Sequence, residues 1–333
     1  MNARIAGMIA GLMLIFAGSS LAAEKDIYNY EAQAAAPAGT KRIVFIATHG
    51  THGGIGNHEF LAGSIYLARR INEVYPNAYA VVYTEDKWPK DLSNASSIIV
   101  SLNHGGKAAQ DAQVKAACDH GAGFMAIHFG TEVNKGAQGE NYLHWMGGYF
   151  ETFWSVNPTW KPEMIIGKHP TANGVKPFAI VDEWYYHLRF VDGMTGVTPI
   201  LSAIAPLNTV HFKEAEKPSE RSGNPATAAK AKAPSQGDKP SERGGNPDVL
   251  KSVQNKEPQV MAWAYTRPDG GRGFGFTGYH VYNNLANDSF RTTLLNGAAW
   301  VSGLDIPENG VPSTTPTKDE LAALIHEAHP AGK

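Results

Sequence analysis

The chain has 333 residues, of which 43% are hydrophobic and 18% charged, with a formal net charge of -2. This length allows one large α/β domain or two small ones with a substantial core. The near-neutral charge, without blocks of basic residues, excludes the electrostatic footprint of a protein that binds nucleic acid or an anionic membrane. The single cysteine, Cys118, cannot form an internal disulfide, so the core has to stabilise the fold.

The N-terminal residues have the pattern of a Sec signal peptide. Arg4 is the only charge ahead of an apolar run at 9–17, small residues follow at 19–23, and charged residues begin at Glu24. We therefore expect a signal peptide over residues 1–23, a periplasmic or secreted mature protein, and no stable membrane anchor after cleavage. The alternative is an uncleaved membrane anchor.

The rest of the chain is expected to contain one domain. We predict a flexible leader over residues 24–40, which are rich in Ala and Pro, and a domain over 41–310. Residues 213–250 contain two near copies of Lys-Pro-Ser-Glu-Arg and almost no large apolar residues, so we predict a mobile insertion there. Residues 311–333 are predicted to be a tail with a short helix, because a Thr-x-x-Glu capping box precedes its apolar residues.

Short apolar runs bounded by turn residues predict buried strands. In the first half of the domain they lie at 42–47, 79–83, 96–102 and 123–129. Helical periodicity occurs between them at 61–74 and 107–120. This alternation predicts an α/β fold, in which a mostly parallel sheet carries helices on both faces. Later strands are predicted at 197–204, 260–266 and 273–277, followed by a helix at 287–301.

Histidines gather where the predicted strands end. His52 and His58 follow the first strand, His104 follows the third, and His128 lies at the end of the fourth. Because ligands bind at the carboxyl ends of parallel strands, we expect these loops to face one crevice. The alternative is that they are solvated loop residues. The Gly-rich loop after the first strand lacks the spacing and the Lys-Ser/Thr of a P-loop, so it is weak evidence for a nucleotide.

Two later segments combine charged groups, aromatic rings and histidine. Aromatic rings beside carboxylates suit sugars, whose C–H faces stack on rings while their hydroxyls take hydrogen bonds. The alternative is a core aromatic cluster with a surface acid pair. The residues concerned are Asp182, Glu183, Trp184 and Tyr185 in the first segment, and Arg272 and His280 in the second.

A series of short motifs occurs in an order that is similar to a known family. The motifs are His52, 58–63, 88–89, 123–128, 157–158, 169–170, 182–186 and 270–274. Together they resemble the ThuA-like (trehalose-utilisation) family, in the class I glutamine amidotransferase-like superfamily, over about 42–310. This resemblance implies a flavodoxin-like sheet with helices on both faces. The insertion at 213–250 departs from the family pattern where that pattern tolerates changes in length.

The resemblance does not extend to glutamine hydrolysis. In class I glutamine amidotransferases a nucleophilic cysteine follows a buried strand on a sharp turn. The corresponding turn here carries His128, and Cys118 lies on the preceding helix. An imidazole cannot replace a thiolate in that chemistry, so we do not expect a glutamine amidotransferase.

The resemblance implies a role in sugar catabolism, in particular of sugars oxidised to a 3-keto form. We expect an enzyme that removes a proton next to the carbonyl of a keto-sugar or keto-glycoside, leading to isomerisation or to β-elimination and cleavage. The candidate bases are Glu132, Asp182 and Glu183. The candidates for stabilising the oxyanion are His128, Arg272 and His280. The candidate substrate contacts are His52, His58, Glu59, His104, Trp184 and Tyr185.

The sequence requires no cofactor, but imidazole and carboxylate side chains are common ligands of zinc-like divalent ions. The candidate metal ligands are His52, His58 and His128. The alternative to an enzyme is a noncatalytic carbohydrate-binding protein with the same pocket. Plain glycoside hydrolysis is less favoured, because Asp182 and Glu183 are adjacent and are expected to point apart unless Glu132 completes the pair. The expected partner is a small sugar or keto-sugar, and assembly into a homo-oligomer stays open.

Overall fold

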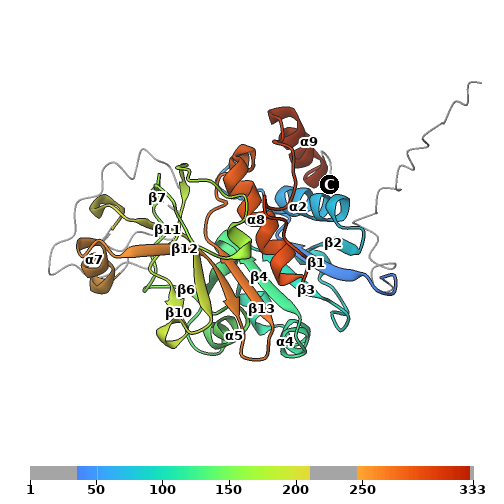
Figure 1. Ribbon diagram of the computed structural model, residues 1–333, viewed down its shortest axis with the longest axis horizontal. Coiled ribbons are helices and arrows are strands. Elements are labelled where there is room, and N and C mark those ends of the chain that lie inside the picture. Colours follow the sequence, from blue (N-terminus) through green and yellow to red (C-terminus); the bar gives the residue numbers. More distant parts are fainter. Residues whose placement is uncertain (1–35, 51, 211–245, 331–333) are drawn as a thin grey trace, which may run out of the picture.

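The computed structural model describes residues 36–50, 52–210 and 246–330. Within them, the central feature is an eight-stranded sheet (Figure 1). Its strands, in their order across the sheet, are β2 (Ala78–Thr84), β1 (Lys41–Ala47), β3 (Ser97–Ser101), β4 (Gly123–Ile127), β13 (Arg272–Phe276), β12 (Pro258–Thr266), β11 (Val197–Ile204) and β8 (Ile165–Ile166). The strands from β2 to β13 are parallel, and those from β12 to β8 alternate in direction. The flavodoxin-like α/β class predicted from the sequence is confirmed.

The apolar runs identified in the sequence form the parallel part of this sheet. Along β1, Ile43 and Phe45 pack into one buried cluster and Val44 and Ile46 into another, so the strand is buried on both faces. The run predicted to extend through 129 ends as a strand at Ile127, where a short 3₁₀ helix (His128–Thr131) begins. This break places His128 at the carboxyl edge of the sheet.

Helices cover both faces of the sheet (Figure 1). The residues of α2 and α8 share a cluster with Ile43 and Phe45, and those of α4 and α5 share the other cluster. The α9 helix packs outside α2. The helices are α2 (Phe60–Val74), α3 (Gly106–Gln110), α4 (Ala112–Asp119), α5 (Ala137–Met146), α7 (Pro247–Gln254), α8 (Asp288–Val301) and α9 (Lys318–Ala328).

Capping residues set the helix boundaries. The helix predicted at 107–120 is divided into α3 and α4, because the Asp111 side chain accepts hydrogen bonds from the backbone N–H groups of Gln113 and Val114 and so starts a new helix. The capping box predicted for the C-terminal segment is confirmed, since Thr317 and Glu320 exchange hydrogen bonds at the start of α9.

Two small sheets lie beside the main one and were not predicted from the sequence. One consists of β10 (Arg189–Phe190), β6 (Gly148–Glu151) and β5 (Glu132–Val133), and the other of β7 (Thr159–Trp160) and β9 (Asp182–Glu183). Because most of these strands have only two residues, they leave no detectable periodicity in the sequence. The antiparallel pairing of Trp160 with Asp182 fixes the segment that carries Glu183.

Three of the expected segments lie wholly or largely outside the described residues: the signal peptide (1–23), the leader (24–40) and the insertion (213–250). The last part of the predicted insertion is instead the start of α7. Asn246 caps this helix, Pro247 begins it, and Val249 and Val253 are buried. In the part of the chain that the structure describes, no helix is long and apolar enough to cross a membrane.

Candidate metal centre

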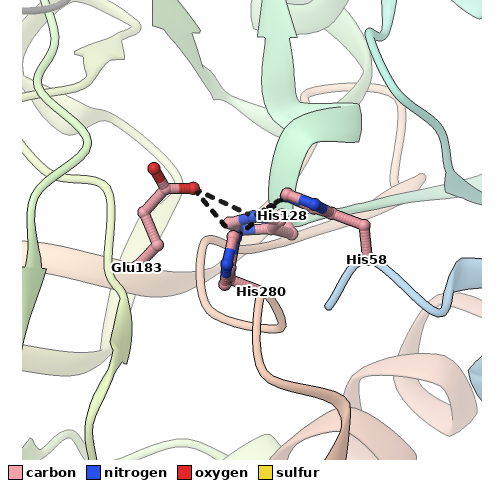
Figure 2. A group of neighbouring side chains, drawn as sticks. All are labelled: His58, His128, Glu183 and His280. Carbon is pink, nitrogen blue, oxygen red and sulfur yellow. Dashed lines mark hydrogen bonds and ion pairs between the residues drawn. The ribbon is translucent and has the colours of Figure 1, made fainter. Parts of the chain in front are cut away.

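Four side chains from distant parts of the sequence converge at the carboxyl edge of the parallel strands (Figure 2). They are His58 ahead of α2, His128 after β4, Glu183 on β9 and His280 after β13. One donor atom from each lies within 4.8 Å of the others, and the four residues are largely buried. The convergence of strand-end loops expected from the sequence is therefore present, although its members differ in part.

The distances between the donor atoms match the needs of a metal ion. His58 Nε2 lies 3.2 Å from His128 Nε2 and 3.0 Å from His280 Nδ1. Glu183 Oε2 lies 3.4 Å from His128 Nε2 and 3.4 Å from His280 Nδ1. Nitrogen and oxygen ligands placed tetrahedrally around zinc, at bonds of about 2.0–2.1 Å, are separated by about 3.3 Å.

His58 is oriented by the Gly-rich loop that ends at it. Its backbone is left-handed, with φ of 53°, and its backbone N–H donates to the carbonyl of His280 at 2.9 Å. Its Nδ1 donates to the carbonyl oxygen of His52 at 2.9 Å. This bond fixes the tautomer and leaves the Nε2 lone pair directed at the centre, as is usual for a metal-binding histidine.

His128 is held in the same way at the end of β4. Its φ is 50°, and its Nδ1 donates to the carbonyl oxygen of Thr277 at 2.8 Å. The imidazole is fully buried, and the ring of Tyr185 packs against it at 4.6 Å between centroids. The Nε2 lone pair of His128 therefore also faces the centre.

Asp182 positions His280 and takes no direct part in the centre. Its carboxylate accepts hydrogen bonds from the backbone N–H groups of Tyr279, His280 and Val281, and from the side-chain amide of Asn284. Burial raises the pKa of the Asp182 carboxyl, although these hydrogen bonds and the neighbouring histidines oppose that effect. This carboxylate, which also accepts from the backbone N–H of Glu183, holds the 279–281 turn, and this is the reason that His280 faces His58.

Glu183 supplies the carboxylate of the centre. Its Oε1 accepts a hydrogen bond from the side-chain amide of Asn157 at 3.0 Å, while Oε2 faces the histidines. The hydroxyl of Tyr185 lies 3.4 Å from this Oε2 and 3.3 Å from His128 Nε2. Successive residues of a strand point to opposite sides, so Asp182 and Glu183 have different environments, as expected from their adjacency.

The electrostatics of the centre favour a cation between the four groups. Burial, together with His128 and His280, lowers the pKa of His58 from 6.5 to about 2. Burial alone would raise the pKa of Glu183, but hydrogen bonds and charges from His128 and His280 lower it below its usual value. Since His58 and His128 both donate through Nδ1, their Nε2 lone pairs face one another, and only a proton or a metal ion relieves this opposition. Three imidazoles and one carboxylate fit a zinc-like divalent ion.

His52, proposed from the sequence as a metal ligand, is not one of these four donors. It touches the centre through its carbonyl oxygen, and its ring stacks on His58 with 3.8 Å between centroids. Glu183 and His280 complete the donor set in its place. Burial lowers the pKa of His52, so the ring forms a neutral wall beside His58.

Arg272, a predicted oxyanion-stabilising residue, lies at the opposite edge of the sheet. It starts β13, a strand of five residues, whose ends are about 13 Å apart at 3.3 Å per residue. Its guanidinium stacks on Trp300 at 4.1 Å and donates to the carbonyl of the same residue at 3.1 Å. Arg272 therefore cannot stabilise a charge at the centre, because the sequence segment that links it to His280 runs the length of the strand.

The other residues that the sequence suggested for the site are not among the four donors. Trp184 is buried in the core against Phe276 and Phe290. The side chain of Glu132 accepts a hydrogen bond from Thr152 Oγ1 at 2.9 Å, and it is not one of the four clustered donors. His104 accepts a hydrogen bond from the backbone N–H of Gly106.

Glu59 adjoins the centre without entering it. It accepts a hydrogen bond from the backbone N–H of Gly56 at 2.9 Å and contacts His329. Three orienting residues, Asn157, Thr277 and Asn284, were not nominated from the sequence. Only Asn157 had a signal there, as part of the family-like motif at 157–158.

The fold and the site together define a class, namely a flavodoxin-like α/β protein with a histidine–carboxylate centre at the strand ends. The family model described as "ThuA: Trehalose utilisation" matches residues 62–301. The chain therefore belongs to the ThuA family, and its family role lies in sugar catabolism. His128, Glu183 and His280 lie inside the matched segment, whereas His58 precedes it.

One similar solved structure is that of a putative ThuA-like protein from Bacteroides uniformis ATCC 8492. Its sequence is 13% identical, the TM-score is 0.47, and the similarity covers 80% of this chain and 93% of that one. No curated protein matches the chain.

Proposed function

We propose that the protein is a divalent-metal-dependent enzyme of sugar catabolism that enolises a keto-sugar or keto-glycoside. The observation that carries the proposal is the set of four facing donor atoms from His58, His128, Glu183 and His280. Membership of a trehalose-utilisation family supports a sugar-derived substrate. A keto-sugar fits such a centre because its reactions begin with removal of the proton on the carbon next to the carbonyl.

Enolisation breaks the C–H bond next to the carbonyl and leaves negative charge on the carbonyl oxygen. A divalent ion held by the four side chains would supply the Lewis acid that stabilises this charge. Of the three carboxylates nominated as the base, only Glu183 lies at the centre, and its Oε2 would hold the ion. The proposal therefore assigns the proton acceptor to the other oxygen, Oε1, which accepts a hydrogen bond from Asn157. Asp182 is excluded from this role because its carboxylate is occupied by five donors.

Tyr185 is the hydroxyl group best placed to assist. Its OH lies between Glu183 Oε2 and His128 Nε2, and its ring is buried. In the proposal this hydroxyl donates a hydrogen bond to the developing enolate oxygen. Return of the proton to the neighbouring carbon gives an isomerised keto-sugar, and loss of a β-substituent gives cleavage, so both outcomes share the same first step.

The test is proton exchange. The purified protein is incubated with 3-keto-trehalose or a 3-keto-glucoside in deuterated water, with and without chelator, and followed by proton NMR. We expect deuterium to enter next to the carbonyl, and the exchange to be lost with chelator and in His128→Ala and Glu183→Gln. His144→Ala is the matched control, because His144 is an exposed histidine on α5. Binding without exchange in the wild-type protein would refute the enzyme and favour a carbohydrate-binding protein.

The proposal also places the protein outside the cytoplasm. The support is the basic, apolar and small-residue succession over residues 1–23. Expression of the full chain in a bacterial host, followed by fractionation and intact mass measurement, tests this directly. A periplasmic product shortened near Ala23 is expected, and a full-length product in the cytoplasmic fraction would contradict export.

A further inference from the structure

The end of α9 lies against the loop that carries His58, although the two are far apart in the sequence. The helix packs on α2, with Leu321 and Ala328 buried, and a bidentate pair between Arg69 and Glu327 ties the two helices together. The residue after the helix, His329, lies 3.0 Å from the carboxylate of Glu59. Residues 318–329 lie beyond the segment matched by the family model, which ends at 301.

The C-terminal end of α9 is held by the two ends of the loop that joins β1 to α2. His49, in the loop after β1, donates from Nε2 to the carbonyl oxygen of Ala328 at 3.1 Å, and its ring stacks on that of His329. On the other side, His329 Nε2 donates to Glu59 Oε2. The position of the His329 ring is therefore defined by contacts with both ends of the loop that joins β1 to α2.

Glu59 uses both carboxylate oxygens to join this helix end to the Gly-rich loop. Its Oε1 accepts from the backbone N–H of Gly56, while Oε2 accepts from His329. Glu59 is 1% exposed, and a carboxylate so buried requires its partners. It occupies the N-cap position of α2 but makes no side-chain capping bond, so linking the loop to His329 is what its side chain does.

The same loop sets the direction of the His58 imidazole. Its backbone is fixed by hydrogen bonds from Tyr282 N–H to the Gly56 carbonyl and from His58 N–H to the His280 carbonyl. His58 follows within two residues in a left-handed conformation, which persists only where the surroundings enforce it. Metal ligation tolerates displacements of only about 0.2 Å, so a small shift of this loop moves Nε2 out of range.

We propose that Glu59 and His329 are positioning residues, through which the C-terminal helix holds His58 in place for the metal centre. This inference rests on the proposed function only in that the centre binds a metal ion. The prediction is that breaking the contact of His329 with Glu59 weakens metal binding without removing any of the four donor groups.

The test uses the full chain and cobalt(II) chloride. Affinity is measured by competition with a chromogenic chelator, and the geometry by the visible absorption of bound Co²⁺. Loss of an outer-shell partner typically weakens metal binding about 10- to 100-fold, and we expect His329→Ala to fall in this range. His329→Gln keeps a side-chain N–H donor and is expected to remain within about threefold of wild type. Glu327→Ala is the matched control, because it removes a different contact of α9, the pair with Arg69 on α2, but leaves His329 intact.

The outcomes are distinguishable from failure of the proposed function. Wild-type affinity in His329→Ala, or an equal loss in Glu327→Ala, would overturn the positioning role. If His329→Ala does not fold, His329→Asn, whose amide is too short to reach Glu59, replaces it under the same criteria. If the wild-type protein binds no Co²⁺, the proposed function fails, and the side-chain NMR signals of His58 then decide. These signals should move in His329→Ala and not in Glu327→Ala, and unchanged signals would overturn the inference.

Discussion

The two edges of the parallel sheet carry similar kinds of residue but arrange them differently. At the amino edge, the guanidinium groups of Arg267 and Arg272 donate to the backbone carbonyls of Ala122 and Trp300, and His169 accepts from Thr171 N–H. At the carboxyl edge, the lone pairs of His58 and His128 face each other and Glu183. Charged and aromatic residues therefore occur at both edges. What indicates a metal site is the arrangement at the carboxyl edge, where lone pairs face one another without a hydrogen atom between them.

The largest expected effect is on metal binding at the carboxyl edge. In His128→Ala the affinity for Co²⁺ should fall by more than about 100-fold, beyond the loss typical of outer-shell residues, because one of the four donors is removed. Chelator competition measures this affinity. The matched change at the amino edge, His169→Asn, should leave the affinity unaltered. Equal losses of Co²⁺ affinity in the two variants would contradict the conclusion that the metal site lies at the carboxyl edge.

The next largest effect is on folding. Asp182→Asn should lower the free energy of unfolding by about 2–4 kcal/mol, because buried backbone N–H groups of Tyr279, His280 and Val281 lose charged acceptors. Urea unfolding measures the change. The control is Asp269→Asn in the amino-edge turn, where the carboxylate is 40% exposed and the loss should stay below about 1 kcal/mol. A small loss of unfolding free energy in Asp182→Asn would show that the 279–281 turn is stable without the Asp182 carboxylate.

A smaller effect separates packing from function at the amino edge. Arg272→Met keeps most of the aliphatic stem but removes the charge over the Trp300 ring, which should cost about 1 kcal/mol of unfolding free energy. Proton exchange on the keto-sugar should be unchanged, because Arg272 lies away from the centre. If Arg272→Met lost proton exchange but kept normal stability, Arg272 would have a role in the reaction after all.

The smallest expected effect is a pH dependence of stability at the amino edge. Burial and the charge of Arg272 lower the pKa of His169 below 6.5. Below pH 6.5, His169 is therefore protonated more in the unfolded chain than in the folded one. Stability contributed by this residue is complete above pH 6.5 and falls with decreasing pH, by less than about 1.4 kcal/mol per pH unit because the ring is half-exposed.

Unfolding of the metal-free protein, followed between pH 7 and pH 5, measures this dependence. His169→Asn should make the profile less steep but not flat, since asparagine preserves the cap on Thr171 N–H and does not titrate in this range. The remaining slope comes from His52 and His58, whose pKa values are also lowered in the folded protein. A profile equally steep in the variant would assign the acid sensitivity to another group.

The sequence predicts the sheet well because four of its parallel strands, β1 to β4, contain continuous apolar runs. It also predicts that His58 and His128 approach one another, since both follow strands whose carboxyl ends share an edge. It cannot predict the choice between His52 and Glu183 as a donor, because that depends on which atom the Gly-rich loop turns inward. The contact between Glu59 and His329 joins residues 270 positions apart, and no local pattern encodes it.

The short strands mark the other limit of sequence interpretation. β9 has only two residues, Asp182 and Glu183, and its pairing with β7 sends the first carboxylate into a ring of backbone donors and the second to the centre. The sequence correctly suggests that the two point apart. Which one faces the centre and which one binds backbone N–H groups is decided by the turn at 279–281, nearly a hundred residues later.

The left-handed backbone at His58 and His128 also bears on how this protein responds to selection. A side chain other than glycine in that conformation costs about 1–3 kcal/mol. Glycine at either position would relieve this strain, but it would also empty a buried site, which costs about 2–5 kcal/mol. The packing of each buried ring therefore has to offset the strain of its own backbone. In this family member the same two residues serve both the core and the centre, so a substitution at either position has to be judged on stability and on metal binding together.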